Sequence, residues 1–333
     1  MNIRLAPITL ITLIAVCIAA LPSFGATDDE IAAKLKTRDI HAVDKLARER
    51  LAKDPQDEAA YNFVAIAALS GDQPMRDAAI PIVEACIEKR PKAAICHHRI
   101  GQLYGTTAMS GGMMAVLKYA PKIKDHFLRA VELDPANFDA RRDLIQYYLQ
   151  APGIAGGSAA KARENAEAHA KVNALQGALL GVDIHLYNKE FDQAEKVLAG
   201  LPPPADDGAR NTYRNYQAGL GFALINASQF PRAQKVFEKL IAAHADYAQG
   251  HFGLGRALLE SGQVDAAIAA LEKTVQLDPT MGAQYRLGIA YQTKGEKTKA
   301  LANLQQFVDT KPPRTGKAAD DARQRIEALK KAA

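Results

Sequence analysis

The stretch AQGHFGLGRALLESGQVDAAIAALEKTVQLDP, residues 248–279, decides the fold of this chain. It predicts two short amphipathic helices that are joined at Gly262 and closed by a final proline. In the second helix, Ala267 and Leu271 lie one turn apart and start a narrow apolar stripe suited to burial. In the first helix, Gly255 has no side chain, so a neighbouring helix can approach closely there. The stretch therefore predicts a helix-turn-helix unit.

The same pattern recurs before and after this stretch, at a period of about 34 residues. Each copy has a small residue, an alanine and a bulky apolar residue in the same order, and this order resembles the tetratricopeptide repeat family. The resemblance is most specific in the C-terminal third. It implies an all-α fold, a right-handed α-solenoid of helix-turn-helix repeats. The equivalent positions are Gly221, Ala233 and Phe237 upstream, and Gly288, Gly295, Ala300 and Pro312 downstream.

Composition agrees with a helical array. Tryptophan is absent and runs of strand-favouring residues are few, which suits closely packed helices better than a sheet. A chain of 333 residues could hold two or three compact domains, but a solenoid grows by one repeat at a time. We expect about seven repeats. The last helix should act as an end cap, because Ile326 and Leu329 share one face and charged residues cover the rest.

Two segments interrupt the repeat pattern. Between the anchors Gly101 and Pro135 the chain has roughly ten residues more than the repeat needs, which predicts an inserted loop at about 105–117. A second, shorter inserted loop is expected at 151–157, before a helix that Ser158 can cap. The predicted divisions are a signal peptide at 1–25, divergent N-terminal repeats at 26–200, a proline-rich break at 201–210, three regular repeats at 211–312 and a capping helix at 313–333.

The N-terminus has the pattern of a secretory signal. Arg4 supplies a positive charge, residues 8–20 form an apolar run, and small residues precede a cleavage point ahead of Ala26. We therefore expect a periplasmic or secreted protein that has no membrane span after cleavage. An uncleaved anchor remains an alternative, although the run is short for a spanning helix, and so does a lipoprotein formed through Cys17.

Charge and cysteine content limit which kinds of ligand and which cellular compartment the protein can have. Without Arg4, the 42 basic residues become 41 against 37 acidic ones, a dispersed excess of four that is too mild for binding nucleic acid. The expected mature chain keeps two cysteines, Cys86 and Cys96, five residues either side of Pro91. Antiparallel helices joined at that proline could bring them together as a disulfide in an oxidising compartment. Two buried thiols are the alternative.

No catalytic signature is present, and we expect a non-enzymatic protein without a cofactor. The eight histidines are scattered, and neither H-E-x-x-H nor G-x-S-x-G occurs. The glycine-rich segment at 152–161 lacks the G-K-[ST] of a phosphate-binding loop, and no strand precedes it. An enzyme whose active groups come from separate repeats remains open.

One cluster of residues with sulfur and imidazole side chains allows a different class of function, metal binding. Sulfur and imidazole ligands in an exported protein would suit Cu(I), as in a periplasmic small-ligand or metal-binding component of a transporter. Methionine also fills irregular apolar gaps, and a disulfide would remove one of the ligands. Packing is therefore the preferred reading, and no metal is expected. The residues concerned are Cys96, His97, His98, Met109, Met113 and Met114.

The family resemblance places the binding surface on the concave face, which the first helix of each repeat lines. Apolar and aromatic side chains with a few amides and arginines fit a protein or peptide partner. The resemblance suggests a partner from the machinery of envelope assembly or secretion. Alternatively, Phe252 and Tyr285 pack only between adjacent repeats. The expected contact residues are His98, Arg142, Gln146, Asn215, Phe222, Gln249, Phe252, Arg256, Leu259, Tyr285 and Gln292.

Overall fold

A computed structural model describes residues 26–202, 204, 206–310 and 316–331. This part of the chain contains seventeen α-helices, one 3-10 helix and no strand, so the predicted all-α fold is confirmed. The helices are α1 (Asp28–Lys36), α2 (Ile40–Lys53), α3 (Glu58–Ser70), α4 (Gln73–Lys89), α5 (Ala94–Ser110), α6 (Gly112–Leu133), α7 (Phe138–Gln150), η1 (Gly153–Ala155), α8 (Ala159–Ala170), α9 (Ala174–Tyr187), α10 (Phe191–Gly200), α11 (Asp207–Asn226), α12 (Phe230–Ala243), α13 (Ala248–Glu260), α14 (Val264–Leu277), α15 (Ala283–Lys294), α16 (Lys297–Val308) and α17 (Lys317–Lys331).

Short polar side chains begin many of these helices. Asp57 accepts a hydrogen bond from the backbone N–H of Ala60 at the start of α3, and Asn137 does the same for Ala140 at the start of α7. Ser158 caps α8 in the same way, as expected from the sequence. Each cap satisfies a backbone donor that has no partner inside its own helix, which is why the helix starts there.

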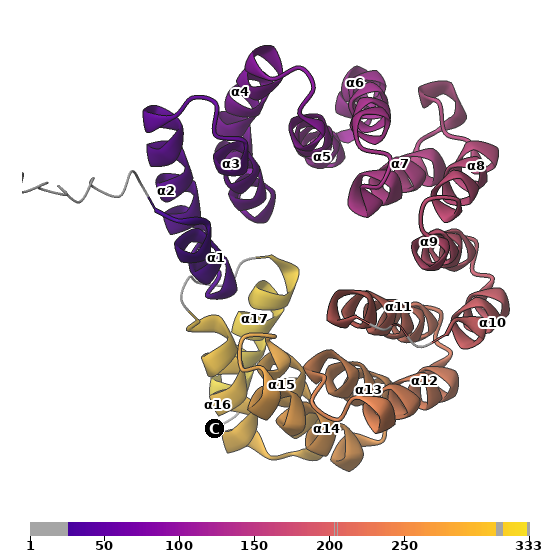
Figure 1. Ribbon diagram of the computed structural model, residues 1–333. Coiled ribbons are helices and arrows are strands. Elements are labelled where there is room, and N and C mark those ends of the chain that lie inside the picture. Colours follow the sequence, from indigo (N-terminus) through magenta and orange to yellow (C-terminus); the bar gives the residue numbers. More distant parts are fainter. Residues whose placement is uncertain (1–25, 203, 205, 311–315, 332–333) are drawn as a thin grey trace, which may run out of the picture.

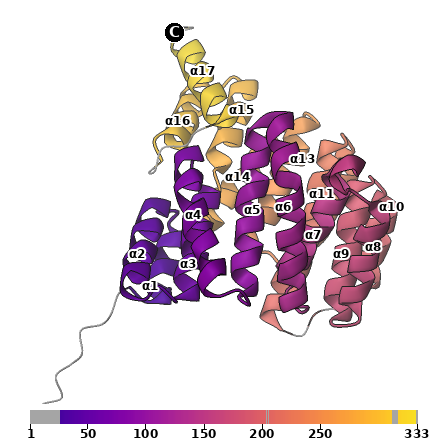
Figure 2. The same cartoon turned by 90° about the horizontal axis from the view of Figure 1, so that it is seen from above.

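The helices form a solenoid of antiparallel pairs. Eight pairs, from α1–α2 to α15–α16, follow one another and α17 closes the array. In Figure 1 the pairs surround a central space, with the first helix of each pair on the inside and the second on the outside. The two ends of the array overlap in that view, but Figure 2 shows that α16 and α17 are displaced along the axis from α1 and α2. The predicted solenoid is therefore confirmed, and the inner wall consists of first helices.

Glycines on the first helices receive large side chains from the second helices. The ring of Phe237, on α12, lies against both Gly221 of its own pair and Gly253 of the next pair. A Cβ at Gly255 would lie 2.6 Å from Cγ of Leu271, and one at Gly288 would lie 2.5 Å from Cγ of Leu304. The repeated small residue is therefore required for close helix packing, as the sequence pattern predicted.

The insertion at 105–117 is not a loop. Its residues lengthen both helices of the third pair, so that α5 and α6 form a hairpin that turns only at Gly111 and Gly112. Gly112 has a φ of +73°, a left-handed conformation that glycine adopts without strain. The segment between these glycines and Ala94 contains no proline, and nothing in it interrupts the helix.

The other two irregular segments are closer to the prediction. Residues 151–157 contain only the 3-10 helix η1, and the hydroxyl of Tyr147 donates a hydrogen bond to the carbonyl of Ala155. In the expected break at 201–210, α10 ends at Gly200 and α11 begins at Asp207, so the irregular part is shorter than predicted.

A disulfide links the second pair to the third. It joins Cys86 on α4 to Cys96 on α5, with their Cα atoms 6.1 Å apart. Both residues are buried beside Tyr61 and Ala93. The bond holds together the two helices that flank the turn at Pro91, at the point where the lengthened hairpin begins.

Candidate partner-binding groove

The eleven predicted contact residues all lie on first helices. His98 is on α5, Arg142 and Gln146 are on α7, Asn215 and Phe222 are on α11, and the remaining six are on α13 and α15. The structure therefore places the whole set along the inner wall shown in Figure 1. Their exposure differs, however, and three of them, His98, Arg142 and Arg256, already bond to the neighbouring first helix.

A series of hydrogen bonds, which we term the inner-wall ladder, joins each first helix from α3 to α15 to the next. Its members come from adjacent repeats and lie about one repeat apart in the sequence, so it ties the array together along its concave side. The pairs are Arg99–Asn62, His98–Asp143, Arg142–Asp183, Tyr216–Asp183, Arg256–Asn226 and Arg286–Glu260.

The centre of the ladder is the carboxylate of Asp183, on α9. Arg142 donates to it at 2.9 and 3.3 Å, and the hydroxyl of Tyr216 donates at 2.6 Å. The guanidinium also lies 5.3 Å from the centre of the Tyr216 ring. Burial raises the pKa of Asp183, while Arg142 and Tyr216 act in the opposite direction. Because Arg142 is held in this way, it supports the groove as well as lining it.

His98 does not face a partner. Its side chain is 1 % exposed, and its Nε2 lies 2.7 Å from Oδ2 of Asp143. Gln102 donates to the same oxygen at 2.6 Å. We expected His98 at the surface because of its place on the first helix, but it packs beside the ring of Phe127 on α6 and against Asp143 on α7. The partly exposed group at this position is Asp143, which the sequence analysis did not single out.

At the C-terminal end, the capping helix α17 bonds to two of the predicted contact residues. The hydroxyl of Tyr285 donates to Asp321 on α17 at 2.8 Å, and Arg325 on the same helix donates to Gln292 at 2.8 Å. The Tyr285 ring also packs against Phe307, with ring centres 5.2 Å apart. These contacts are internal, so the groove available to a partner ends before α15.

The middle of the groove combines aromatic packing with amides. The ring of Phe222 lies 5.1 Å from that of Phe237 and 6.3 Å from that of Phe252. Phe252 therefore packs between repeats, which was the alternative left open for it, and its partly buried ring still borders the groove. Leu259 packs within the same cluster. The hydroxyl of Tyr247 is 2.6 Å from Oδ1 of Asn215 and 2.8 Å from Oε1 of Gln249.

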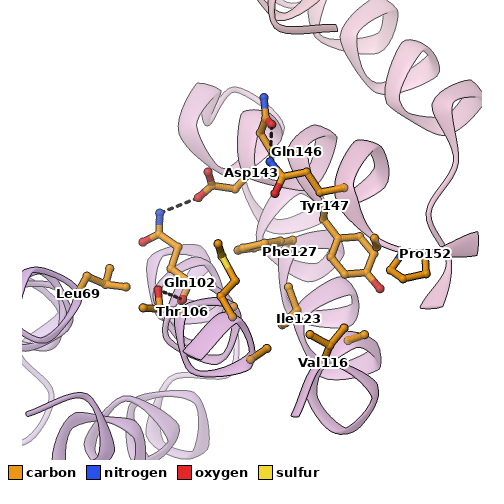
Figure 3. Close-up of a pocket in the computed structure, with 16 residues that line it drawn as sticks. Leu69, Gln102, Thr106, Val116, Ile123, Phe127, Asp143, Gln146, Tyr147 and Pro152 are labelled. Carbon is orange, nitrogen blue, oxygen red and sulfur yellow. Dashed lines mark hydrogen bonds between the residues drawn. The ribbon is translucent and has the colours of Figure 1, made fainter. Parts of the chain in front are cut away.

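A pocket of about 420 Å³ opens in the inner wall between α5, α6 and α7. Its interior is apolar, with Ile123 and Phe127 of α6 among the lining residues, and Figure 3 shows Phe127 between Gln102 on one side and Tyr147 on the other. The lengthened hairpin supplies part of the wall. The lining residues are Leu69, Gln102, Gly105, Thr106, Ala108, Met109, Val116, Ala120, Ile123, Phe127, Asp143, Gln146, Tyr147, Gln150, Ala151 and Pro152.

A carboxylate and two amides lie at one edge of this pocket. Asp143 and Gln146 project from α7, and Gln102 projects from α5. Both contacts to Asp143 use Oδ2, and among the described residues none donates a hydrogen bond to its Oδ1. The pocket can therefore hold a bulky apolar group while a carboxylate and amides at its edge contact a polar or cationic one. Gln146 was predicted from the sequence; the pocket was not.

The cluster of soft ligands is dispersed in the structure. Cys96 is in the disulfide, His98 contacts Asp143, and Met113 and Met114 lie exposed on the hairpin. No group of three or more His, Cys, Asp and Glu side chains in the described ranges could hold a metal ion. The Cu(I) site that the sequence allowed therefore has no geometric support.

His97, the remaining imidazole of that cluster, pairs with a second histidine. Its Nδ1 lies 3.1 Å from Nδ1 of His126, so one ring must donate a proton and the other accept it. Burial lowers the pKa of both rings. The pair is therefore suited to staying neutral and packing α5 against α6, beside the ring of Tyr104.

Comparison with known proteins agrees with this architecture. Two family models, both described as tetratricopeptide repeat, match residues 219–282 and 283–312. The chain is a tetratricopeptide repeat protein. Upstream of these matches, the same helix pairs continue with more divergent sequences.

Relatives with curated descriptions match only part of the chain. The peroxisomal targeting signal receptor of Pichia angusta is 28% identical over 120 residues, which cover 36% of this chain and 21% of that protein. The receptor of the same name from Debaryomyces hansenii is 30% identical over 115 residues, covering 34% of this chain and 18% of that one. This tetratricopeptide repeat protein thus spans about a fifth of the length of these relatives.

A solved structure resembles nearly the whole array. The crystal structure of yeast Tom70 covers 92% of this chain and 61% of its own, with a TM-score of 0.64 and 15% sequence identity. At this identity the likeness concerns the fold. Together, the repeats and their arrangement support a scaffold for protein–protein interaction. No helix in the described part of the chain is long and apolar enough to cross a membrane.

Proposed function

We propose that this protein is a non-enzymatic scaffold whose inner wall binds an extended or helical segment of a partner protein. The pocket between α5, α6 and α7 is the observation that carries the proposal, because it lies on the inner wall and is apolar inside and polar at one edge. Its volume of about 420 Å³ falls within the range of about 300–1,000 Å³ typical of binding pockets. A bulky apolar side chain of the partner would enter it.

The edge of the pocket sets the chemistry of the segment. Asp143 favours a lysine, an arginine or a free amino group next to the apolar anchor, and Gln102 and Gln146 can bond to peptide groups. The curated relatives are receptors for a targeting signal, by name. We extend to this chain only the binding of a polypeptide segment.

The test is to fill the pocket without disturbing the core. Gly105 lines the pocket, and a Cβ built there meets no atom within 4 Å. Gly105→Phe should therefore fold and occupy the space meant for the partner. Peptides selected from a combinatorial library on the wild-type protein should bind Gly105→Phe at least about tenfold more weakly, a loss of about 1.4 kcal/mol.

Gly200→Phe is the matched control. Gly200 is exposed at the end of α10, a second helix outside the inner wall, and it is equally free of neighbours at its Cβ position. Selected peptides should bind this variant as they bind wild type. Equal binding to all three proteins would place the binding surface elsewhere, and selection of a small apolar ligand in preference to peptides would favour a small-ligand carrier.

We further propose that the protein is exported and acts in envelope assembly or secretion. The apolar run that follows Arg4 lies outside the described residues, but its pattern is that of a signal peptide. The Cys86–Cys96 disulfide supports this proposal, because structural disulfides persist mainly in oxidising compartments. N-terminal sequencing of the protein from a periplasmic fraction should give a chain that begins at Ala26. Recovery of an intact N-terminus from the cytoplasm would refute it.

A further inference from the structure

Exposed large apolar side chains gather on the two insertions. Seven such residues occur in the described part of the chain, and five of them belong to the α5–α6 hairpin or to η1. Solitary exposed apolar residues are common on protein surfaces, but a contiguous group marks an interaction site. We call this group the apolar tip, and its members with their exposed fractions are Met109 (80%), Met113 (67%), Met114 (79%), Leu117 (44%) and Ile154 (90%).

Both parts of the tip lie at one edge of the solenoid. The α5–α6 turn and the η1 segment each connect the two helices of a pair, and Figure 2 shows them at the same edge. The helix α6 also contacts η1 directly. A Cβ at Gly156, next to η1, would lie 3.5 Å from the side chain of Lys124 on α6. Lys124 is ten residues beyond Met114 on α6, about 15 Å along the helix, so η1 borders the base of the tip and the four hairpin residues form its end.

Basic residues lie just behind this tip. Lys118 and Lys122 on α6 are exposed, and Lys118 follows the turn at Gly111 by about 10 Å along the helix. The sequence has no acidic residue between Glu88 and Asp125. The same is true from 144 to 163, which includes η1. The hairpin up to Lys124 and the η1 segment therefore carry only basic charges, although Glu84 of α4 bonds to Tyr104, over whose ring Lys122 lies.

We propose that the apolar tip inserts into the interfacial layer of a membrane that contains anionic lipid. An apolar tip backed by lysines matches the order of acyl chains and anionic headgroups, and such insertion reaches about 5–10 Å. The tip is convex, whereas an amphipathic peptide helix needs an apolar groove to lie in. Met109 also lines the pocket, but the other members of the tip do not, so this proposal holds whether or not the pocket binds a peptide.

The first test concerns the apolar part. The full-length protein should float with vesicles of phosphatidylglycerol and phosphatidylethanolamine, and should not float with phosphatidylcholine vesicles. Met113→Gln combined with Met114→Gln should weaken binding about tenfold. The matched control is Val172→Gln combined with Tyr187→Gln, the two large exposed apolar residues of the described chain that are outside the tip. It should bind as wild type does.

The second test concerns the lysines. Lys118→Gln combined with Lys122→Gln should weaken binding about tenfold or more at low salt, and less at high salt. Lys235→Gln combined with Lys239→Gln removes the same charge from exposed positions of α12 and should have little effect. All variants keep the same N-terminal segment, so any lipid binding through it is common to them.

Three outcomes would overturn the proposal. These are no flotation of wild type, equal flotation of tip and control variants that circular dichroism shows to be folded, and equal binding to both kinds of vesicle. If wild type ignores vesicles but binds an acidic amphipathic peptide through Met113 and Met114, the tip docks a protein and the membrane proposal is wrong.

Discussion

Phe237→Ala is expected to lower the free energy of unfolding by about 3–5 kcal/mol. The side chain is 0% exposed, and its ring fills the space between Gly221 and Gly253 on the first helices of two successive pairs. Glycine offers no side chain that could move in to fill the cavity. Removal of the ring therefore loosens one pair and its junction with the next. Urea denaturation followed by circular dichroism measures the loss of stability. Both the midpoint and the slope of the unfolding transition should be compared with wild type, because a repeat array can lose cooperativity.

Two glycine substitutions serve as controls for this packing. Gly253→Ala adds a methyl group that would clash with the Phe237 ring, so it should destabilise the protein. Gly219→Ala adds the same methyl group to the preceding first helix, where space is open, and should stabilise by about 0.5–1 kcal/mol. A cost below about 1 kcal/mol for Phe237→Ala would mean that the junction does not depend on this ring.

The second large effect is expected at Asp183, the centre of the inner-wall ladder. Asp183→Ala should lower the free energy of unfolding by about 2–3 kcal/mol, because it leaves the buried hydroxyl of Tyr216 without its acceptor and releases Arg142. The carboxylate is 6% exposed, so water cannot fully replace it. The arginine side chain is 46% exposed and can turn to solvent, which limits the cost.

A double-mutant cycle with Tyr216→Phe separates these contributions. The Tyr216→Phe variant has no hydroxyl that could lose its acceptor. In that background, the loss of unfolding free energy caused by Asp183→Ala should be smaller by about 1 kcal/mol or more. Asp183→Asn keeps an acceptor and should be milder than Asp183→Ala. If the two substitutions add to within about 0.3–0.5 kcal/mol, Tyr216 and Asp183 are not energetically coupled and the ladder is only a geometric feature.

The helices themselves were readable from the sequence. The capping helix expected within 313–333 is α17, and the helix that Ser158 was expected to cap is α8. A polar cap before an apolar run, and a glycine or proline after it, are local signals that do not depend on the rest of the chain. The insertion at 105–117 was located by counting but was misjudged as a loop. An excess of residues does not say whether they lengthen the helices or form a loop, and here only Gly111 and Gly112 break the helix.

The candidate site was only partly readable. Gln146 and Arg142 were placed correctly on the inner wall, but Asp143 and Asp183 were not singled out. One signal was available for Asp183: it is the only acidic residue in the apolar helix α9, ALQGALLGVDIHLY. A lone carboxylate in such a helix requires a partner from another element. The burial of His98 had no comparable signal, because it depends on contacts with Phe127 and Asp143, which lie far away in the sequence.

The sequence by itself determined the repeat, the pairing of helices, and which helices form the inner wall. These features follow from the 34-residue period and from small residues at fixed positions in each repeat. Only the tertiary structure decided which side chains meet across that wall. Arg142 and Asp183 are 41 residues apart, and His98 and Asp143 are 45 apart. Whether such residues touch depends on the rotation between successive pairs and on the length of each helix. The pocket and the apolar tip arise in the same way, from the lengthened α5–α6 hairpin lying beside η1, an arrangement that no single stretch of sequence contains.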